Sequence, residues 1–273
     1  MGLDLLYAIF SNTFKKLNFL STKSRIVFTD HYFYDDCNNI TLKDNIFDNI
    51  IWGAIRFNGT SKNAIIENNK IHVTLADDTA VITSSTTNRN SELSTIHIIN
   101  NSIDTDVPYV MGIMLQNNFS NIKTKDINVS KNKFNNCYVN AAFLGFFDDV
   151  MVSKNNFSGE KSATGILMQL EDVSKSSNLI KIDQNILEAN NTGISLNARK
   201  GELFCKFLIS DNMIFNETNS QKGFGIILNL GVKGNVSITN NKISNFENAL
   251  YLREKNYKVK HNGLSNNKIN ILK

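Results

Sequence analysis

One short phrase recurs along most of this chain and constrains the fold more than any other feature. It reads apolar, any, apolar, any, any, Asn, any, apolar, and its first copy runs from Ile40 to Phe47. A repeat unit of 21 to 32 residues predicts a solenoid, in which each unit stacks on the next. The nine copies carry their fixed asparagine at Asn45, Asn69, Asn101, Asn132, Asn155, Asn185, Asn212, Asn241 and Asn262.

The phrase predicts a strand that ends in a sharp bend. The apolar residues five and three positions before the Asn share one face of a strand. Asn adopts the left-handed backbone conformation more readily than other residues except Gly, so we expect the fixed Asn to be the bending residue. Stacked copies would place these side chains about 4.8 Å apart. At that distance each amide can donate to the next, so the repeat also predicts an Asn ladder.

A second phrase, small residue, apolar, any, apolar, follows most copies of the first. With both phrases, each rung holds three short strands separated by turns. We therefore predict an all-β, single-stranded parallel β-helix of about nine rungs, whose inward rows are buried only by stacking. The second phrase begins at Gly112, Gly165, Gly193, Gly225 and Ala249, with weaker copies at Ala54 and Ala141.

These features resemble the right-handed parallel β-helix of the pectate-lyase-like superfamily, over roughly residues 40–270. The shared features are three short strands per turn, an Asn at the sharp bend and variable loops on one side. That group includes polysaccharide lyases, polygalacturonases, sugar epimerases and phage tailspike depolymerases. The resemblance implies the coil and a polysaccharide-related function. It implies no catalytic residues, because the members share the coil and not one catalytic set.

The chain divides into an N-terminal segment, 1–39, and the predicted β-helix, 40–273. In the first segment apolar residues recur at helical intervals, which favours an amphipathic helix that caps the first coil. The alternative is one or two degenerate rungs, since Arg25 to Phe28 looks like a strand. The residues at helical intervals are Leu3, Leu6, Tyr7, Phe10, Phe14 and Leu17.

Composition excludes several function classes. The net charge is +4 with acids and bases interspersed, which argues against nucleic-acid binding. The sequence holds no run of 18 apolar residues, so we expect no membrane span, and no signal peptide is visible. The resemblance implies an extracellular or virion-associated location and a possible homotrimer.

The cysteines and histidines show no metal-binding spacing, so we expect no metal or cofactor, apart from Ca²⁺ if the protein is a lyase. We expect the cysteines to be buried small apolar residues and His72 and His97 to be exposed strand residues. The residues considered are Cys37, Cys137, Cys205, His31, His72, His97 and His261.

An outward row of amides follows the second phrase. Amides and an arginine offer paired donors and acceptors, which suit sugar hydroxyls. The alternative is a solvated strand face or a second amide ladder. The predicted substrate-binding residues are Asn58, Gln116, Asn118, Gln169, Asn197, Asn229 and Arg253.

Candidate catalytic residues lie further along the same strands. If Asp148 and Glu171 are neighbours on adjacent rungs, their backbones are about 5 Å apart. One could then act as proton donor and the other as base or nucleophile in glycoside hydrolysis. Asp149, Asp172 and Arg199 lie next to them in sequence or on the next rung. The alternative is that the four acids are loop charges at strand ends.

If the substrate is a uronate, these residues suggest a lyase instead. Arg199 or Lys200 would abstract the proton, and the four acids could hold Ca²⁺. Our leading expectation is nevertheless a protein that binds a long bacterial surface polysaccharide and cleaves it by hydrolysis. The alternatives are a non-catalytic adhesive or structural rod and a polysaccharide lyase or sugar epimerase.

Overall fold

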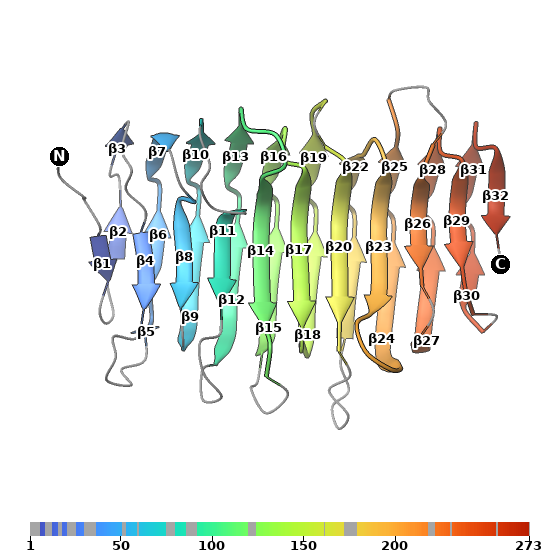
Figure 1. The fold of residues 1–273 in the computed structure, drawn as a ribbon, viewed down its shortest axis with the longest axis horizontal. Coiled ribbons are helices and arrows are strands. Elements are labelled where there is room, and N and C mark those ends of the chain that lie inside the picture. Colours follow the sequence, from blue (N-terminus) through green and yellow to red (C-terminus); the bar gives the residue numbers. More distant parts are fainter. Residues whose placement is uncertain are drawn as a thin grey trace.

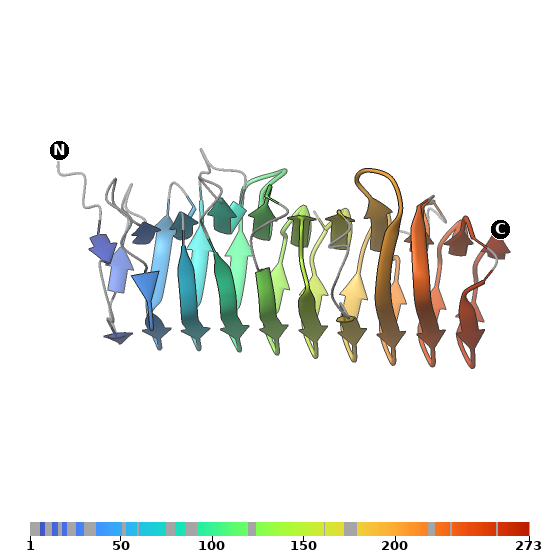
Figure 2. The same ribbon diagram turned by 90° about the horizontal axis from the view of Figure 1, so that it is seen from below.

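The chain forms a parallel β-solenoid in which three sheets make the long faces of a rod (Figures 1 and 2). Strands β1 (Leu6–Ala8) and β32 (Ile269–Leu272) lie at opposite ends of the rod. The computed structural model describes residues 6–8, 13–15, 18–20, 26–29, 37–50, 53–58, 60–74, 80–85, 92–119, 124–160, 162–171, 179–217, 222–229, 231–254 and 256–272.

Sheet A is a stack of 11 parallel strands. Six copies of the second phrase lie in this sheet with both apolar residues buried, namely those that begin at Ala54, Gly112, Gly165, Gly193, Gly225 and Ala249. The copy at Ala141 is shifted by one residue, so its Ala142 and Leu144 face outward. The strands of sheet A are β1 (Leu6–Ala8), β4 (Ile26–Thr29), β8 (Ile55–Asn58), β11 (Ala80–Ser85), β14 (Met111–Asn117), β17 (Val139–Gly145), β20 (Thr164–Leu170), β23 (Thr192–Ala198), β26 (Phe224–Leu228), β29 (Asn248–Leu252) and β32 (Ile269–Leu272).

Sheet B contains the strand that precedes each fixed Asn, and sheet C contains the short strand that follows it. Sheet B consists of β2 (Thr13–Lys15), β6 (Thr41–Lys43), β9 (Ser61–Glu67), β12 (Leu93–Ile99), β15 (Thr124–Ser130), β18 (Asp149–Ser153), β21 (Leu179–Asp183), β24 (Leu203–Ser210), β27 (Val232–Thr239) and β30 (Lys258–Lys260), with β5 (Cys37–Asn38) paired to β9. Sheet C consists of β3 (Asn18–Leu20), β7 (Ile46–Ile50), β10 (Lys70–Val73), β13 (Ser102–Thr105), β16 (Lys133–Asn135), β19 (Asn156–Ser158), β22 (Ile186–Glu188), β25 (Met213–Phe215), β28 (Lys242–Ser244) and β31 (Gly263–Ser265).

The described residues of segment 1–39 form strands and no helix. β1 pairs with β4, and β4 continues sheet A by pairing with β8. β2 and β3 extend the other two sheets by pairing with β6 and β7. Apolar residues at helical intervals, such as Leu6 and Phe14, therefore lie on separate short strands. The expected capping helix is absent from this described part. The strands found there agree with the alternative prediction of degenerate rungs.

The predicted Asn ladder runs without a break through all nine rungs. In each step the side-chain oxygen of one Asn accepts hydrogen bonds from the backbone N–H and the side-chain amide of the Asn one rung earlier. Asn155 Oδ1, for example, accepts from Asn132 N at 2.9 Å and from Asn132 Nδ2 at 3.1 Å. Asn155 Nδ2 donates to Asn185 Oδ1 at 3.0 Å and to the carbonyl oxygen of Val129 at 2.9 Å. The amide thus uses two donors and two acceptor sites, which explains why the repeat requires Asn.

The bend does not fall on the ladder Asn, and that part of the prediction is wrong. In every rung the residue immediately before it takes the left-handed conformation, with φ between 55° and 58°. The ladder Asn keeps its side chain turned inward to make its four hydrogen bonds, so the preceding residue absorbs the bend. These left-handed residues are Asp44, Asn68, Asn100, Lys131, Lys154, Gln184, Asp211, Asn240 and His261.

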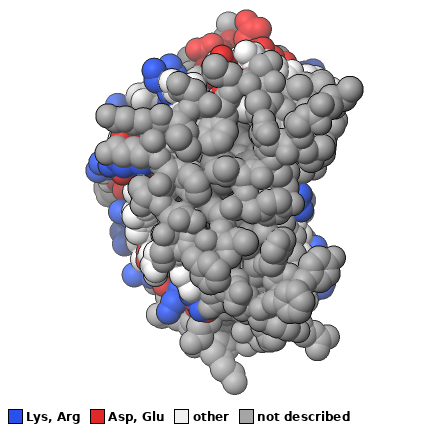
Figure 3. All heavy atoms as spheres, turned by 90° about the vertical axis from the view of Figure 1, so that its left-hand side faces the viewer, with Lys and Arg blue, Asp and Glu red and all other residues white. Residues whose placement is uncertain are grey.

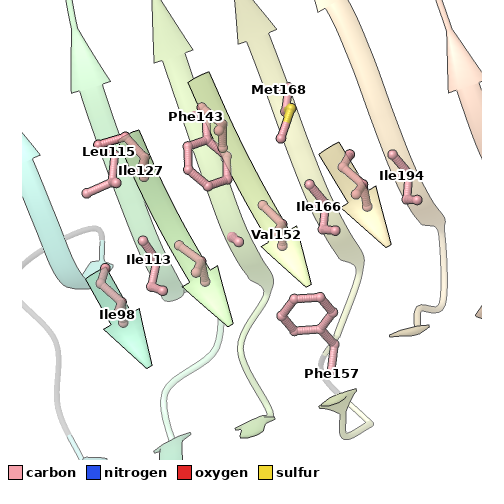
Figure 4. Packing of buried hydrophobic residues seen from close by; sticks show 14 of the residues in the cluster. Ile98, Ile113, Leu115, Ile127, Phe143, Val152, Phe157, Ile166, Met168 and Ile194 are labelled. Carbon is pink, nitrogen blue, oxygen red and sulfur yellow. The ribbon is translucent and has the colours of Figure 1, made fainter. Parts of the chain in front are cut away.

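The core is one continuous column of apolar side chains from Ile40 to Leu252. Figure 4 shows its central part, where aliphatic side chains from sheets A and B fill the space between them. Phe134 and Phe157 stack on successive rungs with ring centroids 4.9 Å apart. Because this interior is filled, ligands must bind on the outer faces.

The glycines of the second phrase lie near the start of the sheet A strands. A Cβ at Gly193 would lie 2.2 Å from Ile214 Cγ2 and 2.5 Å from the carbonyl oxygen of Gly225. A Cβ at Gly165 or Gly225 would lie 2.5 Å or 2.3 Å from its nearest neighbour. Close approach between rungs therefore explains the glycines of this phrase.

Candidate functional site

The outer face of sheet A carries the predicted polar residues in one register row, which we call the polar row. Gln116 pairs with Leu144, Leu144 with Gln169, and Gln169 with Asn197. Asn229 and Arg253 continue the row, since their backbone N–H groups donate to Leu196 O and Leu228 O. Asn58 pairs with Ser85 at the other end, although the side chains of these two residues lie outside the described part.

Side chains of the polar row contact their neighbours. Gln116 Nε2 donates to Asn118 Oδ1 at 2.9 Å, and Asn118 is exposed beyond the end of β14. Asn229 Nδ2 donates to Asn197 Oδ1 on the previous rung. Gln169 is exposed. The row therefore has the partial amide ladder that was one alternative, together with exposed amide groups.

Beside the polar row lies a second row, mostly apolar, that the sequence analysis did not identify. We call it the apolar row, and its members are Met114, Ala142, Leu167, Ser195, Ile227 and Tyr251, in register. Ala142 and Ser195 are buried although they face outward, while the larger members are half-buried. The central "any" position of the second phrase is Met, Leu, Ile or Tyr in several copies, which was the available signal.

Towards β26 and β29 the two rows meet an aromatic group. The rings of Phe224 and Tyr251 have centroids 5.3 Å apart at 45°. The guanidinium carbon of Arg253 lies 4.7 Å from the Tyr251 ring centroid, a cation–π contact that fixes the ring. This arrangement offers an aromatic surface beside hydrogen-bonding groups.

Glu171 is placed at the end of the same face and is engaged by cations. Its side chain is only 10% exposed. Arg199 Nη1 lies 3.5 Å from one carboxylate oxygen, and Lys200 Nζ lies 3.9 Å from the other. Arg199 Nη1 also donates to Asn118 Oδ1 at 3.4 Å. The neighbours of the Glu171 carboxylate are therefore two basic side chains, one of which also contacts an amide, and not a second carboxylate.

The expectation that Asp148 and Glu171 are vertical neighbours is wrong. The backbone N–H of Glu171 donates to Gly145 O at 2.8 Å, which makes Phe146 its register neighbour. Asp148 lies two residues further on, beside sheet B, where its own N–H donates to Thr124 O. The turn after β17 moves the chain from sheet A to sheet B within these residues, which separates the two positions.

The remaining predicted acids have other positions. Asp149 begins β18, and its Oδ1 accepts from the backbone N–H of Leu179 at 3.2 Å. Asp172 lies outside the described residues. With Arg199 and Lys200 facing Glu171, the described part of the four-acid set does not form a cage of oxygens for Ca²⁺.

A separate group of metal-ligand side chains lies on sheet C. His72 Nδ1 is 3.1 Å from Asp104 Oδ2, and His72 Nε2 is 3.4 Å from Asp106 Oδ2. One donor atom from each residue lies within 4.8 Å of the others. Sequence spacing hid this group, because its members are separated by a whole rung. Elsewhere, Cys137 and Cys205 are buried, as expected.

Comparisons with protein families, with curated proteins and with solved structures find no match for this chain. Within the residues that the structure describes, no helix has the length and apolar character needed to cross a membrane.

Proposed function

We propose that this β-solenoid binds an extended polysaccharide on the outer face of sheet A. The observation that carries the proposal is the polar row running beside the apolar row over successive rungs. Gln116, Gln169 and Asn197 supply amides, and Tyr251 with Arg253 supplies an aromatic and cationic end.

The chemistry of the two rows matches a sugar chain. Hydroxyl groups are donors and acceptors at once, and amide side chains offer both. The apolar faces of sugar rings pack on aliphatic and aromatic side chains, as Tyr251 and Phe224 provide. Because the rows cross the strands, a chain bound along them would follow the long axis of the rod. It would meet a new set of side chains about every 4.8 Å.

Cleavage of the bound polymer is a finer hypothesis than binding. Hydrolysis by two carboxylates needs both groups beside the bond that is cleaved. The two carboxyl groups are about 5 Å apart in retaining enzymes and about 6.5–9.5 Å apart in inverting enzymes. Glu171 instead faces Arg199 and Lys200, and its register neighbour on the previous rung is Phe146. A lyase would need Arg199 or Lys200 to act as a base while each faces Glu171. The geometry thus favours a binding protein over an enzyme. From the fold resemblance we also propose that the protein is a homotrimer and that it acts outside the cell or on a virion.

The test is binding of bacterial capsule and O-antigen polysaccharides, measured by affinity electrophoresis. The variants Gln169→Ala, Asn197→Ala and Tyr251→Ala remove one contact each from the proposed face. We expect each to weaken binding about tenfold, which corresponds to a loss of about 1.4 kcal/mol. The matched control is Asn235→Ala, an exposed amide of β27 on sheet B, which should bind like the wild type.

Release of reducing ends and ultraviolet absorbance of unsaturated products, followed in the same samples, test for cleavage. Cleavage lost in Glu171→Gln would add catalysis at this site to the binding function. Binding reduced equally by Asn235→Ala would place the ligand elsewhere. If no polymer of the panel binds, the structural-rod alternative replaces our proposal.

A further inference from the structure

The group on sheet C combines one imidazole with two carboxylates from adjacent rungs. His72 lies in β10 and pairs with Asp104 in β13, so their side chains leave the same outer face. Asp106 follows β13 directly, and its backbone N–H donates to Val73 O at 3.0 Å. That bond holds the turn against the previous rung and brings the Asp106 carboxylate to within 3.4 Å of the imidazole.

Neighbouring side chains orient these donors. Asn135 Nδ2, one rung further on, donates to Asp104 Oδ1 at 2.7 Å, which leaves Oδ2 turned towards His72. Buried Thr105 accepts from the backbone N–H of Val107 at 3.0 Å and so shapes the turn that carries Asp106. Hydrogen bonds of this kind fix the ligands in known metal sites.

The local backbone and charge suit a cation. The register of β10 against β7 shifts between Ile71 and Val73, because Asp48 and Asn49 of β7 lie opposite the single residue His72. Such bulges re-aim side chains and are frequent beside functional sites. Seen from the N-terminal end, Asp and Glu gather at the upper edge of the described surface, while Lys and Arg lie mainly along its sides (Figure 3). That upper edge is where β7, β10 and β13 lie in Figure 1.

We propose that His72, Asp104 and Asp106 form a binding site for a first-row transition-metal dication such as Zn²⁺. An imidazole nitrogen with carboxylate oxygens is a ligand set that suits zinc, whereas Ca²⁺ and Mg²⁺ prefer oxygen alone. In a tetrahedral zinc site the donor atoms lie about 3.3 Å apart. The donors here lie within 4.8 Å of one another, and the Asp106 side chain is 63% exposed, so metal binding requires a shift of this surface side chain that shortens the separation.

The site is independent of the proposed polysaccharide face, because it belongs to sheet C and not to sheet A. Two carboxylates and a neutral imidazole carry a charge of −2, which a dication neutralises. The metal would cross-link two adjacent rungs, since His72 and Asp104 come from neighbouring turns of the solenoid. Metal binding to the folded state alone therefore raises its stability.

The experiment uses the full chain without a polyhistidine tag, after treatment with a chelator. Zn²⁺ is titrated by calorimetry, and Co²⁺ is added separately so that its visible absorption reports nitrogen and oxygen ligation. We expect one Zn²⁺ per chain, a Co²⁺ spectrum and a higher Tm with Zn²⁺. His72→Gln and Asp106→Asn should remove these effects, and Asn135→Ala should weaken binding by about tenfold or more.

The matched control is His97→Gln, because His97 on sheet B faces a carboxylate, Asp126, at 3.6 Å and belongs to no such trio among the described residues. It should bind Zn²⁺ like the wild type. Asp106 is exposed, so its variant tests the site even if His72→Gln fails to fold, which circular dichroism would reveal. Absence of saturable Zn²⁺ binding, unchanged binding in Asp106→Asn, or a preference for Ca²⁺ over Zn²⁺ would overturn the proposal.

Discussion

Truncation of one ladder asparagine tests how the solenoid is stabilised. Asn155 is 1% exposed and lies near the middle of the ladder. Asn155→Ala removes four buried hydrogen bonds, which join its side chain to Asn132 N, Asn132 Nδ2, Val129 O and Asn185 Oδ1. The buried N–H of Asn132 then loses its acceptor in a place that water does not reach, whereas Asn132 Nδ2 keeps Ile98 O and Asn185 Oδ1 keeps the backbone N–H of residue 155.

The expected cost follows from the number of bonds. A hydrogen bond contributes about 1 kcal/mol net, and a buried group left unsatisfied costs about 1–3 kcal/mol. Loss of four bonds therefore predicts a decrease of at least about 4 kcal/mol in the free energy of unfolding. That is a large part of the total stability of a typical domain, about 5–15 kcal/mol.

The chain supplies a control with the same number of bonds. The side chain of Asn262 also makes four, with Asn241 N, Asn241 Nδ2, Ile238 O and Lys260 O. These bonds are partly buried or exposed, so water can replace them. Asn262→Ala should therefore cost about 1 kcal/mol.

Urea unfolding followed by far-ultraviolet circular dichroism gives the free energies, with the m-value as a check on cooperativity, because repeat proteins can unfold in parts. Hydrogen exchange adds a local readout. The amide N–H of Asn132 donates to Asn155 and should exchange faster in Asn155→Ala than in wild type. Equal losses of stability in Asn155→Ala and Asn262→Ala would refute the argument from burial.

Three further predictions concern other parts of the rod. Gly193→Ala should cost about 2–3 kcal/mol in urea unfolding, because its new Cβ would lie 2.2 Å from Ile214 Cγ2; Gly263→Ala, whose nearest neighbour would be 3.9 Å away, should be close to neutral. Burial raises the pKa of Glu188 above its ordinary value, so the folded state keeps this proton to higher pH and the free energy of unfolding should fall as pH rises between the unfolded and folded pKa values. Glu188→Gln should abolish that fall: its free energy of unfolding should match that of wild type below the unfolded pKa and exceed it above the folded pKa. A series of urea titrations at different pH values would show whether it does. Burial also raises the pKa of the Cys137 thiol, so Cys137 should react with iodoacetamide only after unfolding, and rapid labelling of the native protein by mass spectrometry would contradict this.

Much of the architecture was predictable because the repeat is local and periodic. The alternation before each Asn assigns strand faces, and an amide that must bond to its copy on the next rung demands Asn, as at Asn45 and Asn241. The apolar row was less visible, since Met114 or Ile227 at an outward position reads as ordinary variation until stacking aligns them. In the N-terminal segment the helical intervals predicted the wrong structure, because Leu6 and Phe14 lie on separate short strands that belong to different sheets.

The sequence by itself determined the rung, its strands, its inward rows and the ladder, because a period-two pattern and a recurrent Asn specify local geometry. Only the tertiary structure decided which outward side chains meet, because that depends on how each turn distributes its residues between sheets. The turn after β17 places Phe146, and not Asp148, beside Glu171. In the same way, stacking alone brings His72 to Asp104 and Asp106, a rung away in sequence, where no local spacing could reveal a shared site.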